Sequence, residues 1–273
     1  MNLKMLVADI DGTLIQKGGT IAPITKAAIE RLHKDGVLIV PASGRPVDRR
    51  VLDKAKEWEL SFGFDYLIGM NGGDVYDAST QTTNHYHMLN KDVAKRIIDV
   101  LYDFGTIIIY KKAYDEVLVN RIDQHIIESE IRNNSNVFVT SKEDMCGFDI
   151  GKLEINFKDE DEQKLLDLVA SVKTDEFETV ISFPGTLEFV HPLLNKGEGV
   201  KEIQRRTGIK KEEIIAFGDM ENDIGLFETA GTSVCMLNGS DIAKSKAQFI
   251  TDYDVYNDGV GKYIFEHIYK EKI

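Results

Sequence analysis

Two aspartates, Asp9 and Asp11, stand one residue apart between an apolar run and a glycine. Carboxylates so placed can attack an electrophile, move protons or bind a hard cation. Like charges packed together need a cation between them or a shared proton. A solvated turn is the simpler alternative, because aspartate and glycine are common turn residues. An EF-hand calcium loop does not fit, because its sixth position would be Leu14 and its twelfth Thr20.

Three other polar groups lie in comparable positions further along the chain. Ser43-Gly44-Arg45 follows a second apolar run and offers a hydroxyl and backbone N–H groups to an anion. Lys196 precedes a helix pattern, where its charge adds to the partial positive charge of the helix N-terminus. Asp219 follows a third apolar run, and Asn222 and Asp223 come shortly after it. Each group is weak alone, but together they favour a catalytic site.

The elements that must position these groups alternate between strands and helices. Continuous apolar runs predict strands over residues 4–9, 37–40, 66–70, 214–217 and 233–237, and helix patterns cover residues 23–36, 47–58, 197–206 and 222–229. This predicts an α/β fold, a Rossmann-like parallel sheet with helices on both faces. Ligands bind beyond the carboxyl ends of such strands, where Asp9, Ser43 and Asp219 would all lie. Oxygens of Asp9, Asp219 and water could then bind Mg²⁺.

The middle of the chain has a different pattern. Residues 152–157 alternate polar and apolar, as a half-exposed antiparallel strand does, and residues 179–183 and 186–190 predict two strands joined by Pro184-Gly185. We therefore predict an α+β unit at residues 84–185, inserted into a core formed by residues 1–83 and 186–273.

Charge and composition exclude several classes of protein. The formal net charge of −13 argues against nucleic acid as a partner, since that partner requires a basic face. No apolar run is long enough to span a bilayer, which argues against a membrane protein. Two cysteines far apart in the sequence favour a reducing, cytoplasmic setting. A monomer and a small homo-oligomer are both compatible with the sequence.

The joint order of these motifs resembles that of the haloacid dehalogenase superfamily. More narrowly, the chain is similar to the Cof-type phosphatases, which carry a large α/β cap domain between their second and third motifs. The long stretch from Ser43 to Lys196 leaves room for such a cap, which would set substrate specificity. Asn71-Gly72-Gly73 resembles the Asn-Gly turn of that family.

The resemblance implies a role for each motif residue. Asp9 would be the nucleophile that forms an aspartyl-phosphate, and Asp11 the general acid and base. Mg²⁺ would be bound by Asp9, Asp219 and the backbone carbonyl of Asp11. Phosphate would be bound by Ile10, through its backbone N–H, and by Ser43, Gly44, Lys196 and Asn222. Supporting positions would be Gly12, Thr13, Arg45 and Asp223.

These roles imply a Mg²⁺-dependent phosphatase acting on a small phosphorylated metabolite, with sugar phosphates as the first candidates. Mg²⁺ and Lys196 would neutralise a dianion that the acidic chain otherwise repels. Two alternatives stay open: a phosphomutase or other phosphotransferase, which would not deliver the phosphoryl group to water, and a non-catalytic protein that binds a phosphosugar.

Overall fold

The computed structural model describes residues 2–110, 116–133 and 135–272, and its chain divides into two compact units. Unit 1 comprises Met1–Asn84 and Asn195–Ile273, and unit 2 comprises His85–Leu194. The second boundary therefore differs from the predicted one at residues 185 and 186. The reason is strand β11 (Thr186–Val190), which pairs with β9 (Leu153–Asn156) and β10 (Glu178–Phe183) and so belongs to unit 2.

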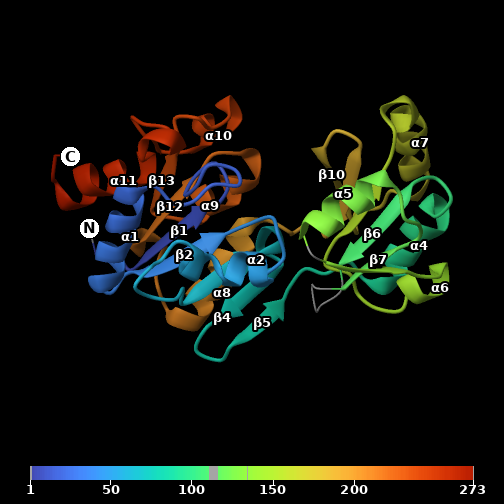
Figure 1. Ribbon diagram of the computed structural model, residues 1–273, viewed down its shortest axis with the longest axis horizontal. Helices are drawn as coiled ribbons and strands as arrows, with labels where there is room; N and C mark the ends of the chain where they lie inside the picture. The colour runs from blue at the N-terminus through green and yellow to red at the C-terminus, as the bar shows by residue number, and fades with distance from the viewer. Residues whose placement is uncertain (1, 111–115, 134, 273) are drawn as a thin grey trace. The chain divides into compact units, whose positions relative to one another are not determined.

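Unit 1 is built on one sheet, whose described strands lie in the order β14-β13-β12-β1-β2-β3-β4-β5. Their bounds are β1 (Met5–Asp9), β2 (Leu38–Ala42), β3 (Tyr66–Gly69), β4 (Asp74–Asp77), β5 (Thr82–His85), β12 (Ile214–Gly218), β13 (Thr232–Cys235) and β14 (Phe249–Ile250). Strand β1 pairs in parallel with both β2 and β12. Figure 1 shows this strand, in blue, beside β12, in orange, so the two ends of the chain share one sheet.

Helices cover both faces of this sheet. Leu6 and Ala8, on one face of β1, belong to the same buried cluster as residues of α1 (Pro23–Lys34) and α11 (Gly259–Tyr263). Leu67 belongs to that cluster too, so its neighbour Ile68 points to the opposite face. There Gly199 of α8 (Lys196–Thr207) approaches Ile68 so closely that a β-carbon would collide with it. The predicted fold class is therefore confirmed.

The predicted helix over residues 47–58 is wrong as one element. The structure has two short helices, α2 (Arg49–Leu52) and α3 (Lys54–Glu57). Asp48 caps α2 by accepting a hydrogen bond from the backbone N–H of Arg50. Asp53 separates the two helices, because its ψ of −2° departs from helical values and interrupts the regular hydrogen-bond ladder.

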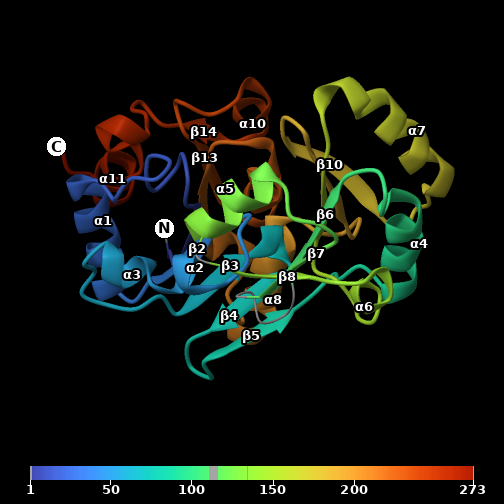
Figure 2. The same cartoon turned by 45° about the vertical axis from the view of Figure 1, so that its right-hand side comes forward.

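Unit 2 has its own sheet, with described strands in the order β10-β11-β9-β6-β7-β8. Besides β9, β10 and β11, this sheet contains β6 (Thr106–Tyr110), β7 (Glu116–Val119) and β8 (Asn136–Val139). Helices α4 (Lys91–Leu101) and α7 (Glu162–Val172) pack against each other, side by side in Figure 2, and their apolar residues join Leu153 and Ile155 of β9 in one core. Helices α5 (Gln124–Asn133) and α6 (Lys142–Met145) also belong to unit 2, whereas α9 (Ile224–Thr229) and α10 (Asp241–Lys246) belong to unit 1.

The other face of β9 and β11 carries buried polar side chains. Glu154 and Glu188 lie directly opposite each other, and like charges in that position repel. Lys152 compensates them, because its Nζ lies 2.6 Å from Oε1 of Glu154 and 3.1 Å from Oε1 of Glu188. Further along the same face, Oγ1 of Thr186 donates to Oδ1 of Asn156 at 2.9 Å. Nδ2 of Asn156 is buried and has no hydrogen-bond partner among the residues that the structure describes.

Within the described residues, no helix combines the length and the apolar character needed to cross a membrane.

Candidate active site

The strands of unit 1 bring three of the predicted motifs to one edge of its sheet. Asp9 is the last residue of β1 and lies beside Ala42, the last residue of β2. Ser43 follows directly, and Asp219 follows β12, which is parallel to β1. The carboxyl ends of parallel strands thus place Asp9, Ser43 and Asp219 at the same edge, where ligands bind in this type of fold.

Lys196 is completely buried, and it is the first residue of α8. The helix begins there because Asn195 caps it, its side chain accepting a hydrogen bond from the backbone N–H of Glu198. Nζ of Lys196 donates to Oδ1 of Asp9 and, at 2.6 Å, to Oδ1 of Asp223. The lysine therefore joins the end of β1 to the turn after β12.

Asp223 organises that turn. Its buried carboxylate accepts hydrogen bonds at Oδ2 from the backbone N–H groups of Asp219, at 2.9 Å, and Met220, at 3.1 Å. Since Oδ1 is bound by Lys196, both oxygens of Asp223 have partners within the protein. Asp223 therefore holds Lys196 and the backbone of Asp219 in place, and its supporting role in catalysis stays a prediction.

Asp219 is held from the loop that follows β1. Oγ1 of Thr13 donates to Oδ1 of Asp219 at 3.0 Å. Gly12 has a φ of +100°, and a β-carbon at this position would collide with Oδ2 of Asp219. Glycine is required here both for its backbone conformation and for this close approach. Asn238 fixes the same turn, because its Nδ2 donates to the carbonyl oxygen of Gly12 at 2.8 Å.

Asp11 faces the loop after β2. Its Oδ2 lies 2.9 Å from a guanidinium nitrogen of Arg45, and the backbone N–H of Arg45 donates to Oγ of Ser43 at 3.1 Å. Asp11, the predicted general acid and base, therefore lies beside the loop of Ser43 and Arg45 that is predicted to bind phosphate (the phosphate cradle). The side chain of Ile10 is buried in the core, which leaves its backbone as the part able to contact a ligand.

Burial dominates the electrostatics of the site. It raises the pKa of Asp9 to about 8, although Lys196 opposes the shift and Asp223 adds to it. Burial, with Asp223 next, also raises the pKa of Asp219 to about 6. For Lys196 burial alone would lower the pKa, but the carboxylates of Asp223 and Asp9 raise it, so the ammonium stays charged. Lys196 therefore pairs directly with two of these three buried carboxylates, Asp9 and Asp223.

This donor set fits a divalent cation. Asp9, Asp219 and Asp223 each offer a carboxylate oxygen, and the three oxygens lie within 4.8 Å of one another. Within the described residues, Oδ2 of Asp9 and Oδ2 of Asp219 accept no hydrogen bond, whereas both oxygens of Asp223 are engaged. Hard cations such as Mg²⁺ prefer carboxylate and carbonyl oxygens, so Asp9 and Asp219 are the suitable ligands. The backbone carbonyl of Asp11 stays a predicted third ligand.

The structure also brings in two asparagines that were not among the predicted site residues. Asn238 supports the Gly12 turn, as described above. Asn71 accepts a hydrogen bond at Oδ1 from Nδ2 of Asn222, a predicted phosphate-binding residue, at 3.1 Å. The Asn-Gly sequence at residues 71 and 72 indicated a turn there, but nothing in the sequence pattern links that turn to Asn222.

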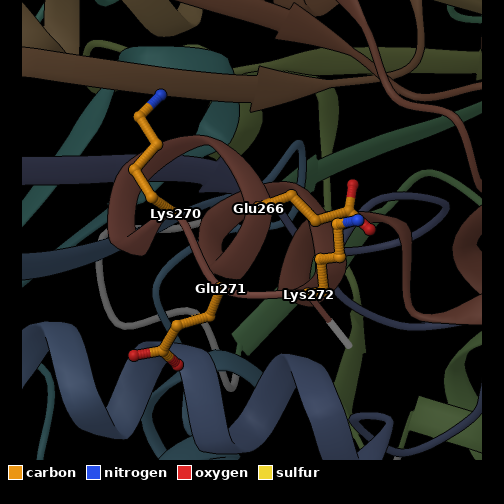
Figure 3. Close-up of a pocket in the computed structure, with 4 residues that line it drawn as sticks. All are labelled: Glu266, Lys270, Glu271 and Lys272. Carbon is orange, nitrogen blue, oxygen red and sulfur yellow. The ribbon is translucent and has the colours of Figure 1, made fainter.

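A surface hollow near the C-terminus lies apart from these residues. Figure 3 shows the four charged side chains that line it, Glu266, Lys270, Glu271 and Lys272. They extend in different directions, and the hollow contains none of the motif residues at the strand ends.

Comparison with known proteins gives concordant results. The family model of the haloacid dehalogenase-like hydrolases matches residues 6–264. A 5-amino-6-(5-phospho-D-ribitylamino)uracil phosphatase of Bacillus subtilis, YitU, is 29% identical over 96% of this chain and 97% of its own. The crystal structure of a Thermotoga maritima protein has a TM-score of 0.85 at 26% identity, with 96% of both chains covered. A subclass IIB sugar phosphatase, BT4131, has the same fold, with a TM-score of 0.79 at 24% identity over 97% of this chain and 98% of its own.

Proposed function

The chain belongs to the haloacid dehalogenase-like hydrolases and is a phosphatase of that family, and from this premise we propose that it hydrolyses small phosphorylated metabolites with Mg²⁺ as cofactor and Asp9 as nucleophile. The observation that carries the proposal is the contact of Lys196 with Asp9 at the edge of the parallel sheet. A buried carboxylate held beside a buried ammonium is suited to attack a phosphoryl group whose charge must be neutralised.

The reaction divides into two displacements. A carboxylate oxygen of Asp9 forms a bond to phosphorus while the bond from phosphorus to the leaving oxygen breaks, and Asp11 gives its proton to that oxygen. A water molecule then attacks phosphorus and gives a proton to Asp11, while the bond to Asp9 breaks and inorganic phosphate leaves. Asp9 and Asp11 return to their starting states.

The remaining site residues bind and orient the phosphoryl group. Ser43 and Gly44 offer a hydroxyl and a backbone N–H, and Lys196 supplies a fixed positive charge. Mg²⁺, held by Asp9, Asp219 and the backbone carbonyl of Asp11, would add charge neutralisation. Such local attraction is needed because the net charge of −13 repels an anionic substrate.

We assign substrate selection to the inserted unit and expect a hydroxyl-rich leaving group, as in a sugar phosphate. Glu154 and Glu188 each engage one oxygen with Lys152, and their second oxygens accept no hydrogen bond within the described residues. Carboxylate oxygens are strong acceptors for hydroxyl donors. A buried charged cluster contributes little to stability by itself, so its presence on a sheet favours a role in recognition.

The setting proposed for this enzyme is the cytoplasm, as a monomer or a small homo-oligomer. Cys146 and Cys235 are both free thiols, which suits a reducing compartment.

A Mg²⁺-supplemented screen against a panel of phosphorylated metabolites tests the proposal. Release of inorganic phosphate from sugar phosphates would support it. Conversion of a hexose phosphate into an isomer without phosphate release would instead identify a phosphomutase. Binding of a phosphosugar without any metal-dependent turnover would identify a non-catalytic binding protein.

Mg²⁺ is expected to stabilise the protein more at pH 8 than at pH 5. Because burial raises the pKa of Asp9 from 3.8 to about 8, the folded metal-free protein keeps a proton that the unfolded chain loses. The stability that Asp9 contributes therefore falls as pH rises from about 4 to about 8. Mg²⁺ binds the deprotonated carboxylates, so its effect grows over the same range. We expect the Mg²⁺-induced rise in Tm to be larger at pH 8 than at pH 5. The difference should be about 2–4 °C for each kcal/mol by which Mg²⁺ raises the free energy of unfolding more at pH 8.

Differential scanning fluorimetry with EDTA or Mg²⁺ at both pH values measures this effect. Asp219→Asn should lose most of the Mg²⁺-dependent rise, whereas Asp103→Asn, which changes an exposed carboxylate of unit 2, should keep it. The same rise in Tm at pH 5 and pH 8 would contradict the prediction.

Glu188→Gln is expected to raise KM for a sugar phosphate roughly tenfold, because a hydrogen bond to a charged acceptor becomes one to a neutral acceptor. The effect on kcat, and on hydrolysis of an aryl phosphate that lacks hydroxyl groups, should be less than about twofold. Steady-state kinetics on both substrates measures the difference. The matched control is Glu176→Gln, because Glu176 pairs with Arg96 on the exposed surface of the same unit. Equal losses with both substrates would argue that Glu188 has a purely structural role.

A further inference from the structure

The turn between β3 and β4 has an unusual backbone. Met70 and Asn71 are consecutive residues that are not glycine, and each has a φ of +49°. L-residues seldom adopt this left-handed conformation, although asparagine tolerates it better than most. Strained conformations of this kind persist where the surrounding structure fixes them, and they cluster at functional sites.

Hydrogen bonds fasten this turn to the predicted phosphate cradle. The backbone N–H of Met70 donates to the carbonyl oxygen of Arg45 at 2.7 Å, and that of Asn71 donates to the carbonyl oxygen of Ser43 at 3.1 Å. On its other side, Gly72 packs so tightly on Asn195 that a β-carbon would collide with the Asn195 carbonyl oxygen. The turn therefore contacts both the Ser43 loop and the residue that caps the Lys196 helix.

The side chain of Asn71 lies between two predicted phosphate-binding residues. Its Oδ1 accepts from Nδ2 of Asn222 at 3.1 Å. A β-carbon at Gly44 would lie 3.2 Å from Oδ1 and 3.5 Å from Nδ2 of Asn71, so the amide packs directly on the glycine. Nδ2 of this half-buried residue donates no hydrogen bond within the described part of the chain.

We propose that Asn71 is a further phosphate-binding residue, whose Oδ1 orients Asn222 and whose Nδ2 donates to an oxygen of the substrate phosphoryl group. This inference rests on the proposed function. A phosphoryl group in the cradle presents several acceptor oxygens, and an amide N–H beside Gly44 supplies a donor without adding a charge. The strained backbone is retained because it holds this amide against both Gly44 and Asn222.

Two substitutions separate phosphate binding from a structural role in the turn. Asn71→Asp keeps the shape and the acceptor for Asn222, but it replaces the donor with a negative charge. We expect kcat/KM for an aryl phosphate to fall about 100-fold or more, and the Kd for inorganic phosphate to rise at least about 30-fold. Asn71→Gly removes the amide and relieves the backbone, so we expect losses of about 10- to 100-fold in both quantities with an unchanged or higher Tm.

The measurements are steady-state kinetics with Mg²⁺, calorimetric titration with inorganic phosphate, and thermal unfolding. Gln81→Gly is the matched control, because Gln81 is exposed and has a φ of +53° in the turn between β4 and β5. It should leave kcat/KM and phosphate affinity within about twofold of the wild type. Because Gln81 also has a left-handed backbone, Gln81→Gly measures the effect of relieving backbone strain alone.

The inference is overturned if both Asn71 variants bind inorganic phosphate within about twofold of the wild type, whether or not their Tm or kcat changes. A wild-type protein that hydrolyses no phosphate ester would refute the proposed function instead. The calorimetric comparison with inorganic phosphate would still decide the role of Asn71 in that case. The two failures are therefore distinguishable.

Discussion

Asp9→Asn is expected to reduce kcat toward an aryl phosphate by about 10⁴- to 10⁶-fold, because it removes the oxygen that would form the bond to phosphorus. The loss should be catalytic and not structural. The amide has nearly the same shape, and Lys196 keeps its hydrogen bond to Asp223. Burial disfavours the charged form of Asp9, which is why its pKa is raised. The neutral amide of Asp9→Asn avoids this cost. We therefore expect a Tm equal to or above that of the wild type.

Measurement requires kcat for a generic aryl phosphate together with thermal unfolding of the same preparation. Asp103→Asn, a matched exchange of an exposed carboxylate, should keep wild-type activity. A test for the covalent intermediate adds a second criterion. After reaction with a substrate labelled in its phosphoryl group, the label should be trapped on the wild-type protein and absent from the variant. Near-wild-type hydrolysis by purified Asp9→Asn would refute the assignment of the nucleophile.

Asp11→Asn is expected to reduce kcat by about 10²- to 10⁴-fold, which is the usual contribution of a positioned acid or base. The loss should depend on the leaving group. An alkyl phosphate needs a proton on its leaving oxygen, so both displacements are impaired. A nitrophenyl phosphate leaves without that proton, so the first displacement is spared while water attack is slowed. The variant should then accumulate phosphoenzyme and release nitrophenol in a burst of about one equivalent per active site.

Stopped-flow absorbance of nitrophenol release measures the burst. Arg45→Met is the companion variant, because Arg45 forms an ion pair with Asp11. If Asp11 acts through proton transfer, Arg45→Met should cost no more than about tenfold, since exposed ion pairs contribute little. Equal losses in the two variants, or full activity in Asp11→Asn, would show that Asp11 does not carry the proton.

The sequence predicts the strand-end positions of the motifs well, and the reason is physical. Buried parallel strands leave continuous apolar runs, and the polar residues that follow them must lie at one edge of the sheet. Asp9, Ser43 and Asp219 were identified in this way, and the structure brings them to the same edge. The contact between Lys196 and Asp9, 187 positions apart, has no local pattern of its own, so the sequence motifs indicate both residues but not their distance.

Other features could not be predicted because they depend on tertiary contacts. The strand at residues 186–190 was predicted correctly, but nothing local determines which sheet it joins, and the unit boundary was misplaced for that reason. The left-handed backbone of Met70 and Asn71 depends on hydrogen bonds to the Ser43 loop. Likewise, Lys152 lies between Glu154 and Glu188 because two strands pair, which the sequence alone does not reveal.

The central position of β1 has a consequence for how the protein forms during synthesis. This strand pairs on one side with β2, which follows soon after it, and on the other side with β12, which the ribosome makes only after all of unit 2. One edge of β1 therefore stays open while residues 85–194 emerge, and that contiguous segment can fold first. Contacts between such distant residues also slow folding. Asp9, the proposed nucleophile, is therefore translated before unit 2, yet the residues that surround it assemble only after β12 has been made.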